Sequence, residues 1–279
     1  MVVLYRPGAE VLENIRSYVD QVEVLHAVDN TEDPDTSFVL ALERIPATRH
    51  LPNGRNLGVA TALNVGARRA IEDGYDWLLT MDQDSTATPG MVAAMLDCVS
   101  RPGAESVGLI SPLHVQVGGK RLEPQERCAE VLVAMTSGSL IRLSAYATVG
   151  PFLDELFMDQ VDNEFCLRLH AAGFGVLQAG EAVLAHRVGD VRHHWFPVPM
   201  YTSNHSPVRR YYITRNRLHV GRIYRDRFPE YRRFEARRIA IEAVKILLHE
   251  RQKMLKLRMM ARGFRDYQRG RLGPYSPRQ

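Results

Sequence analysis

The chain has 279 residues, of which 45% are hydrophobic and 24% charged, and this length suits one α/β domain with an appended segment. The composition excludes a disordered, collagen-like or long coiled-coil chain. The sequence has no apolar run of about 18 residues, so we expect no membrane-spanning helix. Residues 1–7 lack the basic and apolar pattern of a signal peptide, so we expect a cytoplasmic protein. Three widely spaced cysteines, Cys98, Cys128 and Cys166, are expected to be packed, reduced thiols.

The formal net charge of +4 hides a strong segregation of charge. Residues 209–279 hold 21 Lys or Arg and 6 Asp or Glu, a net charge of +15, which leaves residues 1–208 at −11. A basic segment of this kind favours a polyanionic partner, such as nucleic acid, anionic lipid headgroups or a phosphorylated small molecule.

The first 35 residues predict a strand, a helix and a second strand. Residues 2–5 and 22–28 are apolar runs, and Leu12, Ile15 and Val19 recur between them at helical spacing. The second run ends at Asp29-Asn30 and a loop. A unit of this kind is parallel, and ligands bind beyond the carboxyl ends of its strands.

The rest of the chain continues this alternation and then becomes helical. Residues 53–70 begin with Asn53-Gly54 and predict a small-residue helix, without a GxGxxG or Walker loop. Residues 76–81 predict a strand that ends at the sequence DQDS, and Pro89 begins the next helix. Further strands are expected at 107–110, 131–134, 174–177 and 182–185, a tight turn at 137–139, and helices over 162–172, around 211–216 and from 230 to about 266.

The pair Asp82 and Asp84 is the strongest local signal for a site. Two carboxylates one residue apart at the end of a buried strand can both approach one Mg²⁺ or Mn²⁺ ion, which prefers oxygen ligands shared with phosphates. The pair therefore suits a nucleotide diphosphate. The alternative is a solvated turn in which an Asp caps the next helix.

Three further residues are candidates for the same chemistry. Asp162 lies where a helix is expected to begin, and the positive field there would keep it ionised as a general base. The alternative is that it is only an N-cap. In this helix Glu164 and Arg168 are expected to pair on the exposed face. His186 follows a strand and could complete a metal site. Arg215 could clamp phosphate oxygens, or belong to a solvated arginine-rich helix.

Eight motifs follow one another along residues 1–216: VVLYRP, VDN, NLGVATALNVG, DWLLTMDQDS, SGSLI, LFMDQVDNEFCLRLHAAGF, AHRVG and RRYYITRN. This series resembles glycosyltransferase family 2, and within it the bacterial rhamnosyltransferases. The resemblance implies a GT-A fold, a Rossmann-like, mostly parallel sheet flanked by helices. It would occupy residues 1–206, with the nucleotide-sugar half up to about 110 and the acceptor half from about 111, and a basic helical segment would follow over 207–279.

The resemblance also implies a role for each candidate residue. Asp84 and His186 would bind a divalent metal, Mn²⁺ or Mg²⁺, and Asp162 would be the catalytic base. The family commonly has Glu-Asp where this chain has Val161-Asp162, so the first acid is absent. Contacts to the sugar nucleotide are implied for Tyr5, Asp29, Asn56, Asp82 and Arg215.

The expected activity is an inverting sugar transfer. The resemblance implies that the donor is dTDP-L-rhamnose and the acceptor a hydroxyl of a cell-envelope glycan or lipid-linked saccharide. Alternatives are the same fold with a UDP-sugar donor, a nucleotidyltransferase, and a nucleic-acid-binding protein that acts through its basic tail. The tail has an apolar stripe that includes Ile239, Ile246 and Met259. It is expected to hold the enzyme on the inner face of the cell membrane, or else to be a solvated or oligomer-forming helix.

Overall fold

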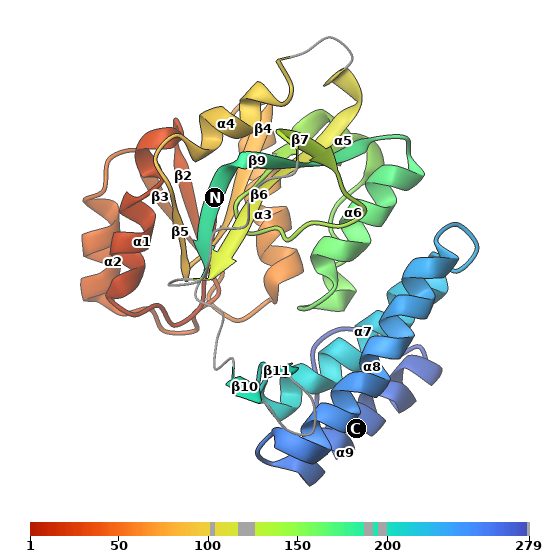
Figure 1. Cartoon of the computed structure of the whole chain (residues 1–279). Coiled ribbons are helices and arrows are strands. Elements are labelled where there is room, and N and C mark those ends of the chain that lie inside the picture. The colour runs from red at the N-terminus through yellow and green to blue at the C-terminus, as the bar shows by residue number, and fades with distance from the viewer. Residues whose placement is uncertain (101–103, 117–125, 187–191, 195–199, 278–279) are drawn as a thin grey trace. The chain divides into compact units, whose positions relative to one another are not determined.

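The computed structural model describes residues 1–100, 104–116, 126–186, 192–194 and 200–277 (Figure 1). The chain divides into two compact units. The first contains residues 1–153 and 162–187, and the second contains residues 154–161 and 188–279. This division lies earlier than the expected boundary after residue 206, and it assigns a short internal segment, residues 154–161, to the second unit.

The first unit is built on one mixed, mostly parallel sheet with the strand order β3-β2-β1-β4-β8-β6-β9-β5, and β7 pairs with β9. Strands β1 to β4 run parallel, β8 runs antiparallel to both β4 and β6, and β6 is parallel to β9. The strands span Val2–Leu4 (β1), Leu25–Asp29 (β2), Thr48–Pro52 (β3), Trp77–Asp82 (β4), Ser85–Ala87 (β5), Val107–Gln116 (β6), Cys128–Glu130 (β7), Ser139–Arg142 (β8) and Gly175–His186 (β9).

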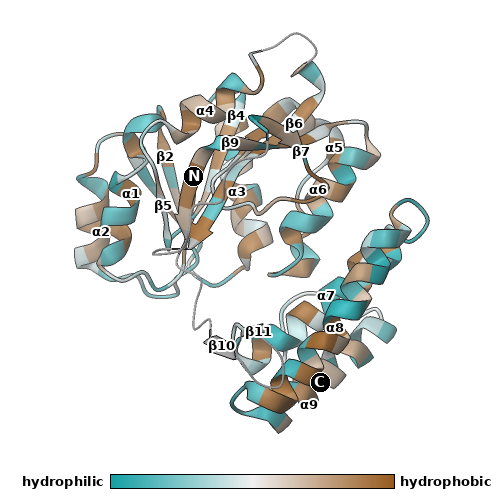
Figure 2. Cartoon of the chain, viewed as in Figure 1, coloured by the Kyte–Doolittle hydropathy of each residue, from teal (hydrophilic) through white to brown (hydrophobic). Residues whose placement is uncertain are grey.

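Helices flank this sheet (Figures 1 and 2). Buried apolar side chains of the strands and helices form the core. The helices are α1 (Glu10–Arg16), α2 (Thr36–Glu43), α3 (Val59–Glu72), α4 (Met91–Asp97), α5 (Leu143–Val149) and α6 (Val161–Ala171). Val2 and Leu4 of β1 and Ile15 of α1 are fully buried in the core. This architecture confirms the expected α/β fold.

Several predicted elements differ from the observed ones. Helix α2 and strand β3 were not expected, because β3 is a half-exposed edge strand of sequence TRHLP without an apolar run. The strand expected at 131–134 is wrong, and β7 lies just before it. The strands expected at 174–177 and 182–185 form one strand, β9, in which residues 180–182 bulge out of register with β6.

The second unit is mainly helical. It contains α7 (Pro207–Ile223), α8 (Pro229–His249) and α9 (Lys253–Gln268), together with the short antiparallel strands β10 (Arg192–His194) and β11 (Met200–Thr202). Proline in the first turn begins both α7 and α8, and Ser206 caps α7 by accepting a hydrogen bond from the Arg209 N–H. Within the described residues, no helix is both long and apolar enough to span a membrane.

The long helix expected from 230 to about 266 is wrong, because the chain breaks between α8 and α9. Glu250 is extended and Gln252 has the left-handed φ of 54°, so helical hydrogen bonding stops there. The buried Glu250 carboxylate accepts from Arg210 at 2.5 Å and from Lys256 at 2.8 Å. These two charge-assisted bonds explain why the chain leaves the helical path at this residue.

Candidate active site

The parallel strands bring four polar segments to one edge of the sheet. Leu4 is aligned with Asp29, Asp29 with Pro52, and Val3 with Asp82. Tyr5, Asn30, Asn53 and the DQDS turn therefore follow their strands at the same carboxyl edge, where open parallel sheets bind ligands.

Tyr5 begins a turn that is fixed on both sides. Its backbone N–H donates to Gln83 Oε1 at 2.8 Å, and Gln83 Nε2 donates back to the Tyr5 carbonyl at 3.3 Å. The following Arg6 has a positive φ of 47°, and its N–H donates to Thr31 Oγ1 at 2.8 Å. Tyr5 is 38% exposed, and the Arg6 guanidinium lies over its ring at 5.1 Å from the centroid.

Asp29 organises the loop after β2 from a fully buried position. Its Oδ1 accepts a hydrogen bond from the Thr31 N–H at 2.9 Å, and its Oδ2 lies 3.0 Å from His50 Nε2. Neighbouring amides extend this network, since Asn53 Nδ2 donates to Asn30 Oδ1, and Asn56 Oδ1 accepts from the Gly58 N–H. In this arrangement Asp29 and Asn56 shape the loop that was expected to hold the nucleotide.

The DQDS turn after β4 is attached to two other parts of the first unit. The Asp82 N–H donates to Ser137 Oγ at 3.1 Å, and Ser85 Oγ lies 2.8 Å from the same atom. Asn14 Nδ2 of α1 donates to the Gln83 carbonyl at 2.8 Å. Asp82 is half-buried and Asp84 is exposed, so the turn presents its second carboxylate to solvent.

Strand pairing brings His186 beside this turn. In the antiparallel β5–β9 pair, Ser85 is aligned with His186, which places the His186 backbone one residue from Asp84. The His186 side chain lies outside the part of the chain that the structure describes. Aspartate oxygens and an imidazole nitrogen suit Mn²⁺ or Mg²⁺, so the donor types at this edge fit the expected metal. Among the described residues, however, no group of three His, Cys, Asp or Glu is arranged to hold an ion.

Two residues near this turn were not expected from the sequence. His114 of β6 places Nε2 at 2.8 Å from the Ser137 carbonyl and so supports the serine that contacts Asp82. Tyr18 is 1% exposed, and burial raises the pKa of its hydroxyl, with a further contribution from the nearby Asp82 charge. Isolated His and Tyr residues have no motif, which explains why sequence reasoning missed them.

Asp162 lies in the first turn of α6, as predicted, and is half-buried. Its Oδ1 accepts a hydrogen bond from the Asn163 N–H at 2.8 Å. Glu164 and Arg168 form the expected ion pair at 2.8 Å, but not on an exposed face, because the Glu164 side chain is only 2% exposed. Arg168 also donates to the carbonyls of residues 149–151, so this pair anchors α6 to the loop after α5.

Arg215 does not have the exposed position that a phosphate clamp requires. It is fully buried in the second unit, where Nη1 donates to the Gly273 carbonyl at 2.6 Å and Nη2 to the Leu156 carbonyl at 3.2 Å. Further bonds reach Asn216 Oδ1, the Tyr211 hydroxyl and the Glu155 carbonyl. These contacts use all five N–H donors of the guanidinium, which leaves none for a diphosphate.

Arg215 and Asn216 instead hold the segment that leads into α6. Asn216 Nδ2 donates to the carbonyls of Leu156, Met158 and Asp159 at 2.6–2.9 Å. In this segment Phe157, Asp159 and Gln160 have positive φ values of 57–68°, a conformation that costs energy for residues with side chains. Arg215 and Asn216 therefore stabilise a strained backbone segment that was not predicted from the sequence.

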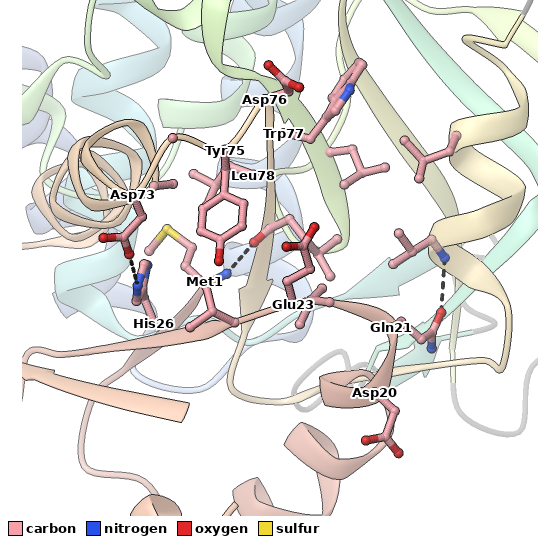
Figure 3. A pocket seen from close by; sticks show the side chains of 18 residues that line it. Met1, Asp20, Gln21, Glu23, His26, Asp73, Tyr75, Asp76, Trp77 and Leu78 are labelled. Atoms are coloured by element: carbon pink, nitrogen blue, oxygen red, sulfur yellow. Dashed lines mark hydrogen bonds and ion pairs between the residues drawn. The ribbon is translucent and has the colours of Figure 1, made fainter. Parts of the chain in front are cut away.

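A large cavity of about 790 Å³ lies at the opposite edge of the sheet, at the amino ends of β1, β2 and β4 (Figure 3). His26 Nε2 lies 3.2 Å from Asp73 Oδ2 in its wall, and burial lowers the pKa of this imidazole. The Met1 amine donates to the Leu79 carbonyl. Asp20, Glu23, Asp73 and Asp76 give it an acidic lining. A nucleotide diphosphate would be repelled here, so this cavity does not compete with the DQDS edge as the donor site.

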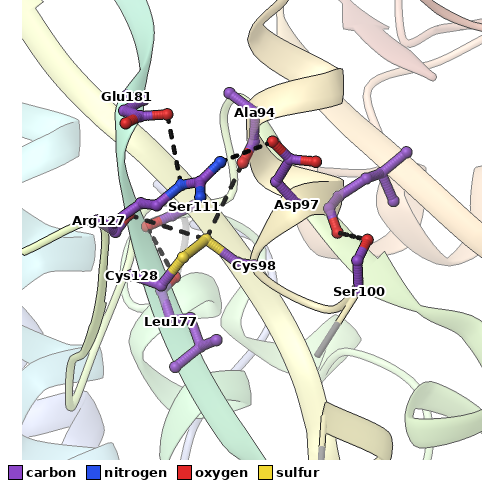
Figure 4. Close-up of a disulfide and its surroundings, with 10 residues drawn as sticks. Ala94, Asp97, Cys98, Ser100, Ser111, Arg127, Cys128, Leu177 and Glu181 are labelled. Carbon is purple, nitrogen blue, oxygen red and sulfur yellow. Dashed lines mark hydrogen bonds and ion pairs between the residues drawn. A yellow bond between two sulfur atoms is a disulfide. The ribbon is translucent and has the colours of Figure 1, made fainter. Parts of the chain in front are cut away.

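The expectation of three reduced thiols is wrong, because Cys98 and Cys128 form a disulfide (Figure 4). It joins the end of α4 to the start of β7, and Arg127 next to it pairs with Asp97 at 2.9 Å. The 30-residue separation gave no pairing signal. Cys166 is a buried thiol as expected, and burial raises its pKa to about 12.

Comparison with known proteins identifies similar sequences that are named as rhamnosyltransferases. The chain is 27% identical to the dTDP-rhamnosyl transferase RfbF of Shigella flexneri over 241 residues, 77% of each chain. It is 29% identical over 190 residues to an N-acetylglucosaminyl-diphospho-decaprenol L-rhamnosyltransferase of Mycobacterium tuberculosis, which covers 52% of this chain and 61% of that protein.

Two solved structures share the fold at low sequence identity. The mannosyltransferase PcManGT from Pyrobaculum calidifontis, in complex with GDP-Man and Mn²⁺, has a TM-score of 0.58 and 14% identity over 99% of this chain and 76% of its own. GalNAc-T7 with UDP, GalNAc and Mn²⁺ has a TM-score of 0.60 and 12% identity over 94% of this chain and 56% of its own. The family model described as "Glycosyl transferase family 2" matches residues 1–146. This match covers more than half of the sequence, and the chain belongs to glycosyltransferase family 2.

Proposed function

We propose that this glycosyltransferase moves L-rhamnose from dTDP-L-rhamnose to a hydroxyl of a cell-envelope glycan or lipid-linked saccharide. The observation that carries the proposal is the DQDS turn at the carboxyl edge of the sheet, with His186 aligned beside it. The names of the two rhamnosyltransferases support the donor, and the decaprenol compound in one name supports a lipid-linked acceptor. The proposal keeps the cytoplasmic location expected from the sequence.

The residues at the carboxyl edge would bind the donor. We assign Asp84 and His186 to a divalent metal, which when bound offsets negative charge on the departing nucleotide diphosphate. Tyr5 would stack on the base, Asp82 would face the ribose, and Asp29 and Asn56 would keep the surrounding loops in place. Arg215 has no part in this site, because its donors are used inside the second unit.

Asp162 would act as the base. The acceptor oxygen attacks the anomeric carbon, the bond from that carbon to the diphosphate oxygen breaks, and the proton of the acceptor hydroxyl moves to the Asp162 carboxylate. A single displacement inverts the anomeric configuration. The first-turn position of Asp162 favours its ionised form, because the positive end of the α6 dipole stabilises negative charge there.

The test separates donor binding from transfer. Thermal shift with dTDP, dTDP-rhamnose and UDP-sugars, each with Mn²⁺, Mg²⁺ or EDTA, should show metal-dependent stabilisation by the dTDP compounds. Asp84→Asn should remove that stabilisation, while Asp162→Asn should keep it and abolish transfer. A preference for UDP compounds would refute dTDP-rhamnose as the donor but not glycosyl transfer as the activity. Near-normal turnover of Asp162→Asn would disprove the role of Asp162 as base.

A further inference from the structure

The helix pair α8–α9 exposes an unusual number of large apolar side chains. They lie on α8 and at the start of α9, and we call this exposed surface the outer face. Its apolar members are 47–63% exposed: Phe234, Ile241, Val244, Leu247, Leu248, Met254 and Leu255. Seven large apolar side chains exposed on two successive helices are a sign of an interaction surface.

The acidic residues of α8 are turned the other way. Glu242 pairs with Arg210 at 2.7 Å and with Arg217 at 2.8 Å, and Glu235 lies 2.7 Å from Arg217. Glu250 pairs with Arg210 and Lys256. Together these six charged residues form an inner network in which three acids balance three bases, so beyond Glu230 no carboxylate of α8 contributes to the outer face.

The basic residues that remain are on the outside. Arg233 and Arg237 of α8 are exposed, as are Arg251 and Lys253 at the turn into α9. Arg238 is also exposed, but it pairs with Glu235 at 3.3 Å. Residues 229–268 contain 11 Lys or Arg and 5 Asp or Glu. Colouring by hydropathy shows hydrophilic and hydrophobic stretches side by side along both helices (Figure 2). The outer face is therefore both apolar and cationic, because folding has removed its acids to the inner network.

We propose that the outer face binds an anionic lipid bilayer surface. The apolar side chains enter the boundary between headgroups and acyl chains, and the surrounding arginines contact lipid phosphates, as in other basic amphipathic helices. A second copy of the chain fits this surface less well, because two-fold pairing would place the same arginines against one another. Nucleic acid would account for the arginines but not for the exposed Phe, Ile, Val and Leu side chains. This binding goes beyond sugar transfer and needs neither donor nor metal.

The test is flotation of the full chain with vesicles, without any sugar nucleotide. We expect binding to vesicles rich in phosphatidylglycerol and weak binding to phosphatidylcholine alone. Raising the salt from about 0.1 M to about 0.5 M should weaken the binding to the anionic vesicles but leave a measurable part, since the apolar contribution is not screened.

Two sets of variants separate the contributions. Ile241→Ala, Leu247→Ala and Leu248→Ala together should lower the partition coefficient at least about tenfold, while the matched control Leu40→Ala with Ile71→Ala should leave it unchanged. Arg233→Gln, Arg237→Gln and Arg251→Gln should each lower it about fivefold. Exposed arginines of the first unit give the control for net charge: Arg44→Gln with Arg68→Gln.

Three results would overturn the proposal once circular dichroism shows that the variants are folded. The first is no binding to anionic vesicles at low salt, and the second is binding that the triple alanine variant does not change. The third is a dimer in sedimentation equilibrium that this variant dissociates, since the outer face would then be covered by a second copy. Each result is independent of the donor tests, so failure here leaves the proposed transferase activity untouched.

Discussion

Replacing Arg215 by Met tests whether this arginine is structural. Met keeps an unbranched side chain of similar length between Tyr211 and Tyr212, whose rings lie about 5 Å from the guanidinium. In this variant the Glu155 carbonyl still accepts a hydrogen bond from the Gly273 N–H. The Leu156 carbonyl still accepts one from Asn216 Nδ2. Among the described residues, the Gly273 carbonyl and Asn216 Oδ1 have no second donor. A buried acceptor left without a donor costs about 1–3 kcal/mol. Asn216 is fully buried but Gly273 is half-buried, so Arg215→Met should lower the free energy of unfolding by about 1–4 kcal/mol.

Urea unfolding followed by far-ultraviolet circular dichroism measures this loss in the helical unit. Arg215→Lys keeps the charge but has three donors in place of five, so we expect an intermediate loss. Under conditions where the variants are folded, the affinity for the nucleotide diphosphate should not change. A variant that unfolds within about 1 kcal/mol of the parent but binds the nucleotide more weakly would refute the structural role and restore the phosphate contact.

Three other predictions concern single features of the fold. Asn64→Ala removes hydrogen bonds of 2.8 Å to the Phe152 carbonyl, the Phe152 N–H and the Tyr146 hydroxyl, so urea unfolding should show a loss of about 3–5 kcal/mol, and a loss below about 1 kcal/mol would contradict it. Cys98→Ser opens a loop of 30 residues and should cost about 3–4 kcal/mol relative to the oxidised parent but little relative to the reduced one. Burial, with Arg209 and Arg210 adding to it, lowers the pKa of His205 to about 4, so the unfolded chain binds the extra proton between pH 6.5 and 4. Stability should therefore fall on acidification through this range, by at most about 3 kcal/mol from this group, and His205→Asn should flatten the profile.

Sequence reasoning predicted which polar segments share the carboxyl edge of the sheet, because the signals for that edge are local. The DQDS turn follows an apolar strand, and the strand, helix, strand pattern fixes parallel pairing, so the carboxyl ends of β1, β2 and β4 had to meet. The place of Asp162 in the first turn of α6 was equally local, since helix periodicity and a first-turn acid occur together there. The roles of Asp84, His186 and Asp162 stay predictions until the binding and transfer experiments are made.

The features that sequence reasoning missed depend on contacts between distant parts of the chain. The Cys98–Cys128 disulfide spans 30 residues, and Arg215 bonds to carbonyls about 60 residues away in both directions. An arginine in an arginine-rich helix has the same local pattern whether it faces solvent, a phosphate or backbone carbonyls. Only the packing of the second unit distinguishes these possibilities.

This distinction changes the meaning of the +15 charge on residues 209–279. Arg210, Arg217 and Lys256 are buried against glutamates, and Arg215 is buried against carbonyls, so these four cations stabilise the helical unit and do not act on a partner. The inner network also removes three of the segment's six acids from the surface. The exposed surface of this segment therefore carries fewer carboxylates than the composition of the segment indicates. A basic segment can in this way use part of its charge for folding and still present a cationic face, and the experiments on Arg215 and on the outer face test the two parts separately.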